Sequence, residues 1–265
     1  MSTLSAWVEG VGVLGPALPD WPYAARVLRA EQPWHSAPTV LPAPQCLPAA
    51  ERRRTGAVVK LALAVGLEAA AHAGADAATL PAVFTSSGGD GANCHEICEV
   101  LASPERLISP TRFHNSVHNA AAGYWGIATG ATAACNALCA YDASFGAGLL
   151  EAMAQVAVEE RPVLLIAYDA SYPEPLRSAR PIPDAFGVAL VLAPRAGAGA
   201  LAQLQARLTD EPADALPDAQ LERLRSAIPA ARSLPLLAQL ARRSPGRVVL
   251  EYLERGLAVE VSACH

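Results

Sequence analysis

The chain has 265 residues, of which 52% are hydrophobic and 17% are charged, and its formal net charge is −5 at pH 7. This length allows one large domain or two small ones, and the acidic balance provides no general attraction for nucleic acid or an anionic membrane. The charged fraction lies below the roughly one quarter typical of soluble domains, so apolar surface remains to be buried against a partner.

Residues 1–16 lack the basic start and the long apolar stretch of a signal peptide. No apolar run approaches the roughly 20 residues that are needed to span a bilayer. We therefore expect a cytoplasmic protein that contacts neither nucleic acid nor a membrane. The six cysteines need not pair in that compartment.

Strand and helix patterns alternate along most of the chain. Apolar runs bounded by turn residues predict the strands, and apolar residues at helical spacing predict the helices between them. The proline-rich segment 19–48 is expected to be irregular. The predicted strands are residues 6–14, 80–86, 135–141, 162–168 and 188–192. The predicted helices are residues 49–74, 93–101, 115–130 and 143–160.

Two of these strands, 162–168 and 188–192, are apolar on both faces, as expected for a sheet that helices cover on both sides. The alternation predicts an α/β domain with a mixed, mostly parallel sheet flanked by helices. The tail is predicted to be a small α+β extension of this sheet. Its predicted strands are residues 201–208, 247–253 and 257–262, and its predicted helices are residues 218–228 and 234–243.

Cys94 and Cys98 lie four residues apart in the predicted helix 93–101. Together with Ile97 and Leu101 they complete an apolar stripe at helical spacing, which predicts that both cysteines are core residues. The glycine-rich segment 87–91 lacks the spacing of either nucleotide-binding fingerprint. No cofactor is expected.

His114 and His118 are also four residues apart and could share one helix face, with Cys94, His95 and Cys98 as further metal ligands. However, the residue after His114 is not the glutamate that metalloproteases carry there. An ordinary pair of hydrogen-bonded histidines is the preferred interpretation, and no metal is expected.

Asp142 lies where the strand 135–141 passes into the helix 143–160. The backbone N–H groups and the dipole at such a helix start favour negative charge, and enzymes place nucleophilic cysteines there. The first interpretation of Asp142 is a helix N-cap, worth about 1 kcal/mol. That role is compatible with a second one, in which the aspartate stands at a nucleophile position.

Residues 119–152, NAAAGYWGIATGATAACNALCAYDASFGAGLLEA, resemble the N-terminal half of β-ketoacyl synthases. That family shows a similar Asn-x-Ala-Ala-Gly helix, an Ile-x-x-Gly-Ala turn and a strand that ends in the active-site cysteine. An ungapped superposition places Asp142 at the position of that cysteine. Residues 9–16, 86–89 and 184–192 resemble flanking strands and a loop of the same family. The resemblance implies a thiolase-like single lobe at residues 1–195, with residues 196–265 as a short extension packed on the same domain.

The resemblance also implies that this chain does not catalyse condensation alone, and no catalytic residue is expected. Neither Cys135 nor Cys139 falls on the aligned position, and the tail holds one histidine, His265, where ketosynthases carry two catalytic histidines in a second lobe. A decarboxylative condensation needs a thiolate for the acyl chain and donors for the developing negative charge. Asp142 would repel that charge.

This pattern is similar to the chain-length factors of type II polyketide systems, including those that make aryl polyene pigments. These subunits lack the cysteine, pair with an active ketosynthase and help to shape the tunnel for the growing chain. The resemblance implies a heterodimer with a catalytic ketosynthase in fatty-acid or polyketide-type biosynthesis, with an acyl carrier protein as an indirect partner. The candidate tunnel or interface residues are Phe113, His114, His118, Asn119, Tyr124 and Trp125.

Two alternatives remain open. A homomeric acyl- or ligand-binding protein would need the same fold and the same core. The segment DASFG approaches the G-x-S-x-G elbow of serine hydrolases and acyltransferases, with Ser144 as the nucleophile. In that alternative Asp142 replaces the first glycine, and Ser144 would lie within the helix.

Overall fold

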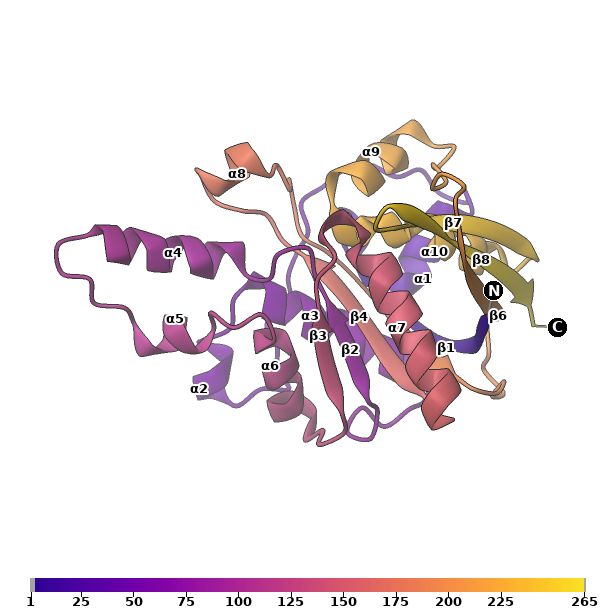
Figure 1. Ribbon diagram of the computed structural model, residues 1–265, viewed down its shortest axis with the longest axis horizontal. Helices are drawn as coiled ribbons and strands as arrows, with labels where there is room; N and C mark the ends of the chain where they lie inside the picture. The colour runs from indigo at the N-terminus through magenta and orange to yellow at the C-terminus, as the bar shows by residue number, and fades with distance from the viewer. Residues whose placement is uncertain (1–2, 265) are drawn as a thin grey trace.

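One mixed sheet runs through the centre of the computed structural model, which describes residues 3–264 (Figure 1). Over these residues the strand order is β3-β2-β4-β5-β1-β6-β8-β7. The strands are β1 (Leu4–Leu14), β2 (Ala82–Thr85), β3 (Cys135–Leu138), β4 (Val163–Asp169), β5 (Phe186–Ala193), β6 (Ala202–Thr209), β7 (Gly246–Tyr252) and β8 (Arg255–Ala263).

The mixed sheet with flanking helices is confirmed, but most of its strand pairings are antiparallel, whereas a mostly parallel sheet was expected. Among the described strands, β2 pairs in parallel with β3 and β4, and the remaining pairings are antiparallel. The reason lies in the connections: β4 and β5 are joined without a long crossover helix, and β6, β7 and β8 continue the sheet as antiparallel neighbours. The boundary expected near residue 195 therefore falls between two strands of one sheet.

Helices cover both faces of the sheet. One face packs against α3 (Ala57–His72) and α6 (Ala120–Thr129). The hydrophobic core between this face and the two helices includes Leu164 and Ile166 of β4. The other face packs against α1 (Trp21–Leu28), α7 (Ser144–Glu159), α9 (Ala219–Ala227) and α10 (Leu234–Arg242), and takes up Leu165 of β4. Successive side chains of this strand thus enter two different cores, as the apolar run predicted.

Close contact between α3 and β1 depends on two glycines of β1. A Cβ atom on Gly12 would lie 2.1 Å from the carbonyl oxygen of Val65, and one on Gly10 would lie 2.2 Å from that of Ala69. The Glu68 carboxylate also accepts hydrogen bonds from the backbone N–H groups of Val13 (2.8 Å) and Trp21 (2.6 Å). Burial raises the pKa of this carboxyl. The helix therefore holds β1 and the start of α1 in place.

Several predicted helix boundaries are wrong. The predicted helix 49–74 is divided into α2 (Ala49–Arg52) and α3, and the proline-rich segment 19–48 contains α1. The predicted helix 115–130 is preceded by α5 (Pro110–His114) and a turn, and α6 begins only at Ala120. The turn forms because the Asn115 side chain donates to the carbonyl of Arg54 (2.9 Å) and accepts from the Tyr124 hydroxyl (3.2 Å). These distant contacts replace the next helical turn.

The helix α4 (Gly91–Ala102) projects from the sheet together with α5 (Figure 1). Cys94 and Cys98 are exposed on it, and Leu101 is 47% exposed, so the prediction that the cysteines are core residues is wrong. The apolar stripe exists, but no second layer of the described chain covers it. The remaining short elements are α8 (Leu176–Ala179) and the 3-10 turns η1 (Tyr141–Ala143) and η2 (Pro229–Ser233).

Within residues 3–264, none of the helices combines the length and the apolar character that crossing a bilayer requires. The terminal histidine of the tail, His265, lies outside the described residues.

Candidate functional site

The candidate site is the turn that leads from β3 through η1 into α7, which we call the elbow (residues 139–144). Tyr141 has a φ of +53°, in the left-handed region, so the chain turns sharply before the helix. Asp142 follows it in η1. Neither η1 nor α7 has a side-chain cap, and the N-cap interpretation of Asp142 is therefore wrong.

The Asp142 carboxylate instead lies between two arginines. Its Oδ1 accepts from a terminal nitrogen of Arg180 at 2.6 Å, and its Oδ2 accepts from Arg232 at 3.1 Å. The guanidinium of Arg180 also lies 3.7 Å from the centre of the Tyr141 ring. The arginines come from the β4–β5 connection and from η2, so Asp142 connects two distant parts of the chain to the elbow.

The ion pairs continue beyond Asp142. Arg232 also binds Glu251 of β7, and Glu251 accepts from Arg225 of α9 at 3.1 Å. Arg225 in turn pairs with Glu222 at 2.7 Å. We call this series, from Arg180 to Glu222, the ion-pair chain. Its three carboxylates and three guanidiniums compensate one another and join the elbow to the tail.

We expect the substitution Asp142→Asn to lower the free energy of unfolding by about 2 kcal/mol, because Arg180 and Arg232 lose the charge between them. The matched control is Asp210→Asn, since the 88% exposed Asp210 also pairs with an arginine, Arg255, at 2.8 Å. That variant should change stability by less than about 0.5 kcal/mol. Urea denaturation measures both values, and equal effects would contradict a structural role for Asp142.

Ser144 is not available as a nucleophile in this structure. It is 2% exposed, its hydroxyl oxygen accepts from the Ala140 N–H at 3.0 Å, and it lies 2.7 Å from the carbonyl oxygen of Tyr141. These contacts close the elbow on itself. The geometry favours a structural role for this serine over the hydrolase alternative.

Asp169, at the end of β4, is a buried carboxylate that the sequence analysis did not identify. Its Oδ1 accepts from the backbone N–H (2.9 Å) and the hydroxyl (2.6 Å) of Ser87, and its Oδ2 accepts from the Ala230 N–H (2.9 Å). Burial raises the pKa of Asp169 to about 6, although these hydrogen bonds oppose the rise. This residue ties the glycine-rich loop to η2.

Because the pKa of Asp169 is higher in the folded state than in the unfolded state, its protonation favours the folded state at pH values below the unfolded pKa. This contribution to stability is lost as the pH rises through about 6. We therefore expect the stability difference between wild type and Asp169→Asn to fall by about 2 kcal/mol between pH 4 and pH 7. Urea denaturation at several pH values measures it. A difference that grows with pH would show that the hydrogen bonds outweigh burial.

The six candidate tunnel or interface residues do not form one site. Tyr124 and Trp125 are 1% and 2% exposed and face the core, where Trp125 contacts Phe84 edge to face at 6.3 Å. Phe113, His114, His118 and Asn119 are exposed. Whether any of them contacts a partner stays a prediction.

The two histidines do not share a helix face, because His114 ends α5 and His118 lies in the turn before α6. His114 packs edge to face on Tyr124 at 6.4 Å, and the His118 ring lies 3.4 Å from the Ser86 hydroxyl. Within the described part of the chain, no group of three or more potential ligands could hold a metal ion.

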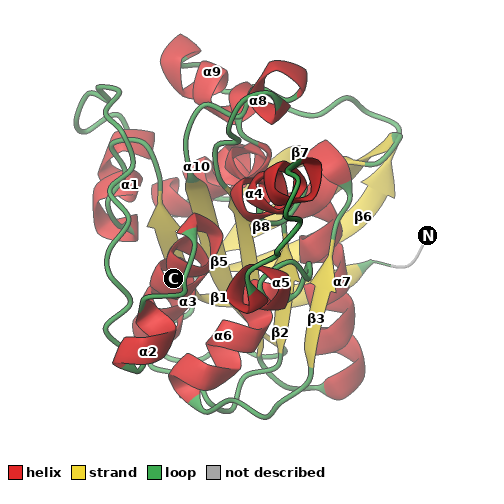
Figure 2. Ribbon diagram, turned by 90° about the vertical axis from the view of Figure 1, so that its left-hand side faces the viewer, coloured by secondary structure: helices red, strands yellow, loops and turns green. Residues whose placement is uncertain are grey.

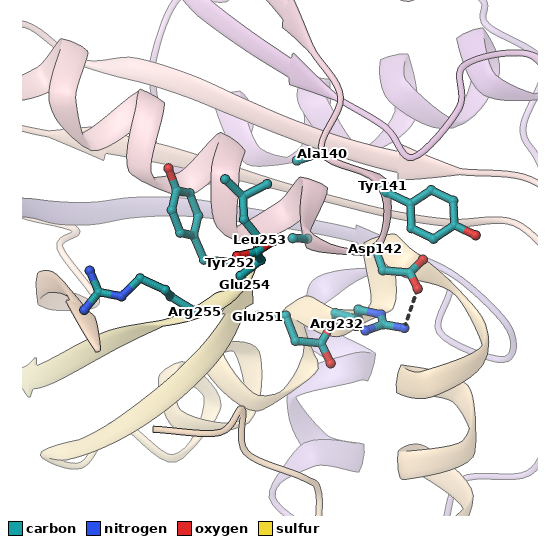
Figure 3. A pocket seen from close by; sticks show the side chains of 10 residues that line it. Ala140, Tyr141, Asp142, Arg232, Glu251, Tyr252, Leu253, Glu254 and Arg255 are labelled. Carbon is teal, nitrogen blue, oxygen red and sulfur yellow. Dashed lines mark hydrogen bonds and ion pairs between the residues drawn. The ribbon is translucent and has the colours of Figure 1, made fainter. Parts of the chain in front are cut away.

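A pocket of about 660 Å³ lies beside the elbow (Figure 3). Residues 140–143 line one side, residues 251–255 line the other, and Arg232 lies between them. The arginines that hold Asp142 come from segments with no motif of their own, so no signal in the sequence identified them.

Comparisons with known proteins show the family and the fold. Residues 27–245 match the family of β-ketoacyl synthase N-terminal domains. No curated protein matches the sequence. Among solved structures, the fold resembles a ketosynthase in complex with its chain length factor from Xenorhabdus doucetiae. This match has 23% identity and a TM-score of 0.73, and it covers 97% of this chain and 99% of the other.

Two further structures are similar over nearly the whole chain. One is a type II polyketide synthase acyl-carrier protein in complex with its ketosynthase bound to the hexaketide, with 11% identity, a TM-score of 0.76, and coverage of 99% and 100%. The other is the ishigamide ketosynthase/chain length factor, with 14% identity, a TM-score of 0.68, and coverage of 97% and 98%. The thiolase-like α/β fold predicted from the sequence is confirmed.

Proposed function

The chain belongs to the family of β-ketoacyl synthase N-terminal domains, and we propose that it is the non-catalytic, chain-length-factor-type subunit of a ketosynthase pair. In this role it binds an active ketosynthase as a heterodimer and helps to shape the tunnel that holds the acyl chain. The pathway is of the fatty-acid or polyketide type, such as aryl polyene biosynthesis. An acyl carrier protein is an indirect partner.

The arrangement around Asp142 carries the proposal. At the position that the sequence resemblance matches to the ketosynthase cysteine, this chain has a carboxylate fixed by Arg180 and Arg232 at 2.6 and 3.1 Å. A carboxylate held in this way is a poor nucleophile, and its charge opposes the negative charge that develops during condensation. The elbow therefore fits a subunit that supports a reaction in its partner.

The two edges of the sheet support pairing through β3. At the β7 edge, the N–H of Val249 donates to the Asp214 carboxylate (2.8 Å), and its carbonyl accepts from the Asp214 N–H (2.9 Å). At the β3 edge, the carbonyls of Ala134 and Leu138 accept from the N–H groups of Ala82 and Ser86. The backbone groups of Cys135 and Ala137 therefore face outward. An edge that the described chain leaves open can pair with another strand.

The helices α4, α5 and α6 lie on the side of the molecule that faces the viewer in Figure 2, near β2 and β3. Five of the nine large hydrophobic side chains that are exposed in the described chain lie within residues 101–127. They are Leu101, Leu107, Phe113, Val117 and Ile127. Such a concentration on α4, α5, α6 and their connections favours a protein interface that includes the β3 edge.

A tagged pull-down from the native host tests the proposal, with mass spectrometry to identify bound proteins and gel filtration to size the complex. We expect a full-length, cysteine-bearing ketosynthase at equal stoichiometry. Recovery of the chain alone, as a monodisperse homomer, would contradict pairing and favour the homomeric ligand-binding alternative.

A further inference from the structure

Another pocket, of about 710 Å³, shares no lining residue with the pocket beside the elbow. Its walls are the end of β1 with the turn that follows it, the start of α1, one face of α3 and the irregular segment 37–42. None of its described lining residues belongs to β3 or α6, so it also lies outside the proposed interface. Its volume falls within the range of small-molecule sites.

The lining of this pocket combines an apolar surface with two carboxylates. Apart from Asp20, Tyr23 and Glu68, it consists of alanine, valine, leucine, proline and glycine residues. One of these, Val40, is 80% exposed and leaves apolar surface in water at the pocket. No lysine, arginine or histidine of the described chain lines it. A mostly apolar pocket with a few polar groups is the usual form of a ligand site.

Glu68 of α3 is a half-buried carboxylate with unused acceptor capacity. One oxygen accepts from the Val13 N–H at 2.8 Å and the other from the Trp21 N–H at 2.6 Å. A carboxylate offers about four acceptor sites, and within residues 3–264 no further donor and no ion-pair partner reaches it. Burial and the nearby charge of Asp20 both raise its pKa. A carboxyl perturbed in this way inside a pocket is a typical ligand-binding group.

Asp20 supplies the second carboxylate. It caps α1, where its Oδ1 accepts from the Tyr23 N–H at 2.7 Å, while its Oδ2 receives no hydrogen bond from the described chain. Arg26 of α1 lies over the Tyr23 ring at 5.6 Å, outside the lining, and it forms no ion pair with either carboxylate in the part of the chain that the structure describes. The pocket therefore presents two negative groups without a positive side chain between them.

Two walls of the pocket are held in place by hydrogen bonds. In the turn after β1, Gly15 and Leu18 exchange two backbone hydrogen bonds, of 2.9 and 3.0 Å. In the segment 37–42, the Thr39 N–H donates to the Asp184 carboxylate at 3.0 Å, and its hydroxyl donates to the carbonyl of Ala185 at 2.7 Å. The pocket is thus formed before a ligand arrives, which lowers the entropic cost of binding.

An ammonium group matches these acceptors, because it carries a positive charge and three hydrogen-bond donors. It would also favour the ionised form of Glu68, which burial disfavours. An apolar body attached to it would cover lining that is otherwise exposed to water. We propose that this pocket binds a small organic cation, a primary ammonium group on an apolar body. The inference goes beyond the proposed function, since neither pairing nor the handling of an acyl chain requires such a ligand.

Calorimetric titration of the full chain with benzylammonium, benzyl alcohol and benzoate tests the inference, because these probes share one ring and differ in charge. We expect benzylammonium to bind at least about tenfold more tightly than benzyl alcohol, and benzoate to bind more weakly than the alcohol. A preference for the ammonium probe below about tenfold, or no binding of it at millimolar concentration, would overturn the inference.

The variant Asp20→Asn removes one carboxylate and keeps the cap of α1, because asparagine caps helices as well as aspartate does. It should weaken benzylammonium binding about fivefold. The matched control is Asp218→Asn, since Asp218 caps α9 by accepting from the N–H groups of Gln220 and Leu221 and lies outside the lining. It should leave binding unchanged. Equal weakening in both variants would show that net charge alone attracts the probe, and would overturn the inference.

A second pair of variants changes the charge at the pocket without touching either carboxylate. Val40 is 80% exposed, so the fold should accept both Val40→Lys and Val40→Gln. The lysine should weaken benzylammonium binding about tenfold by placing an ammonium group of its own at the pocket, and the glutamine should weaken it less than about threefold. Thermal denaturation verifies that each variant is folded. Unchanged binding in Val40→Lys, or equal weakening in the two Val40 variants, would contradict the proposed site.

Discussion

The substitution Ala137→Pro is expected to weaken pairing with the ketosynthase by about a hundredfold or more, while the isolated chain stays folded. The N–H of Ala137 faces away from β2, so its loss leaves the ladder between β2 and β3 intact. Proline is tolerated on an edge strand when its missing N–H faces outward, but it blocks the addition of a new strand there. Surface plasmon resonance measures the affinity, and thermal denaturation measures the stability.

The neighbouring substitution Leu138→Pro is the matched control, because the backbone of Leu138 lies on the β2 side of the ladder. It should cost about 3 kcal/mol of stability.

A second variant, Gly123→Ala, adds a methyl group to α6 where no atom lies within 4 Å, so the fold should tolerate it. We expect it to weaken pairing by crowding the interface. Unchanged pairing in both Ala137→Pro and Gly123→Ala would place the interface elsewhere.

The substitution Gly12→Ala is expected to lower the free energy of unfolding by about 4 kcal/mol, toward the upper end for overpacked cores. The new Cβ atom would lie 2.1 Å from the carbonyl oxygen of Val65, which belongs to the helix backbone and cannot rotate away. α3 would have to move from β1, and the hydrogen bond from Val13 to Glu68 would lengthen. Urea denaturation of the purified variant measures the change.

Gly199→Ala serves as the control, because a Cβ atom on Gly199 meets nothing within 4 Å and its φ is not positive. This variant should be as stable as the wild type or slightly more stable. If Gly12→Ala were tolerated equally well, the close contact between α3 and β1 would not be a determinant of this fold.

The sequence allowed a good prediction of the sheet and a poorer one of the helices. The strands stood out because long apolar runs such as β4 and β5 must be buried on both faces. α1 was missed, although Asp20 caps it by accepting from the Tyr23 N–H at 2.7 Å and a proline follows in its first turn. This helix-start signal was present in the sequence, but the prolines around it led to the prediction of an irregular segment.

The prediction for Cys94 and Cys98 failed for a different reason. An apolar stripe shows which face of a helix avoids water, but not whether the same chain covers that face. On α4 the described chain leaves both cysteines exposed, which is consistent with the proposed interface on this side. Periodicity alone could not distinguish the core of one chain from a contact between two chains.

The sequence resemblance matched Asp142 to the nucleophile position, but it could not identify the side chains that bind this carboxylate. Arg180 and Arg232 are 38 and 90 residues away in sequence, and neither belongs to a recognisable motif. Only the packing of the β4–β5 connection and η2 against the elbow brings them together. Local propensity favoured an N-cap, and distant charges prevailed over it.

The most direct test of the account is a reconstituted condensation assay with the ketosynthase recovered from the host and its acyl carrier protein. We expect no condensation by this chain alone, full activity with the partner, and complete loss when the partner's active-site cysteine is replaced by alanine. Asp142→Ala in this chain should leave measurable condensation when the pair remains assembled. Condensation by this chain in the absence of any cysteine-bearing ketosynthase would contradict the account.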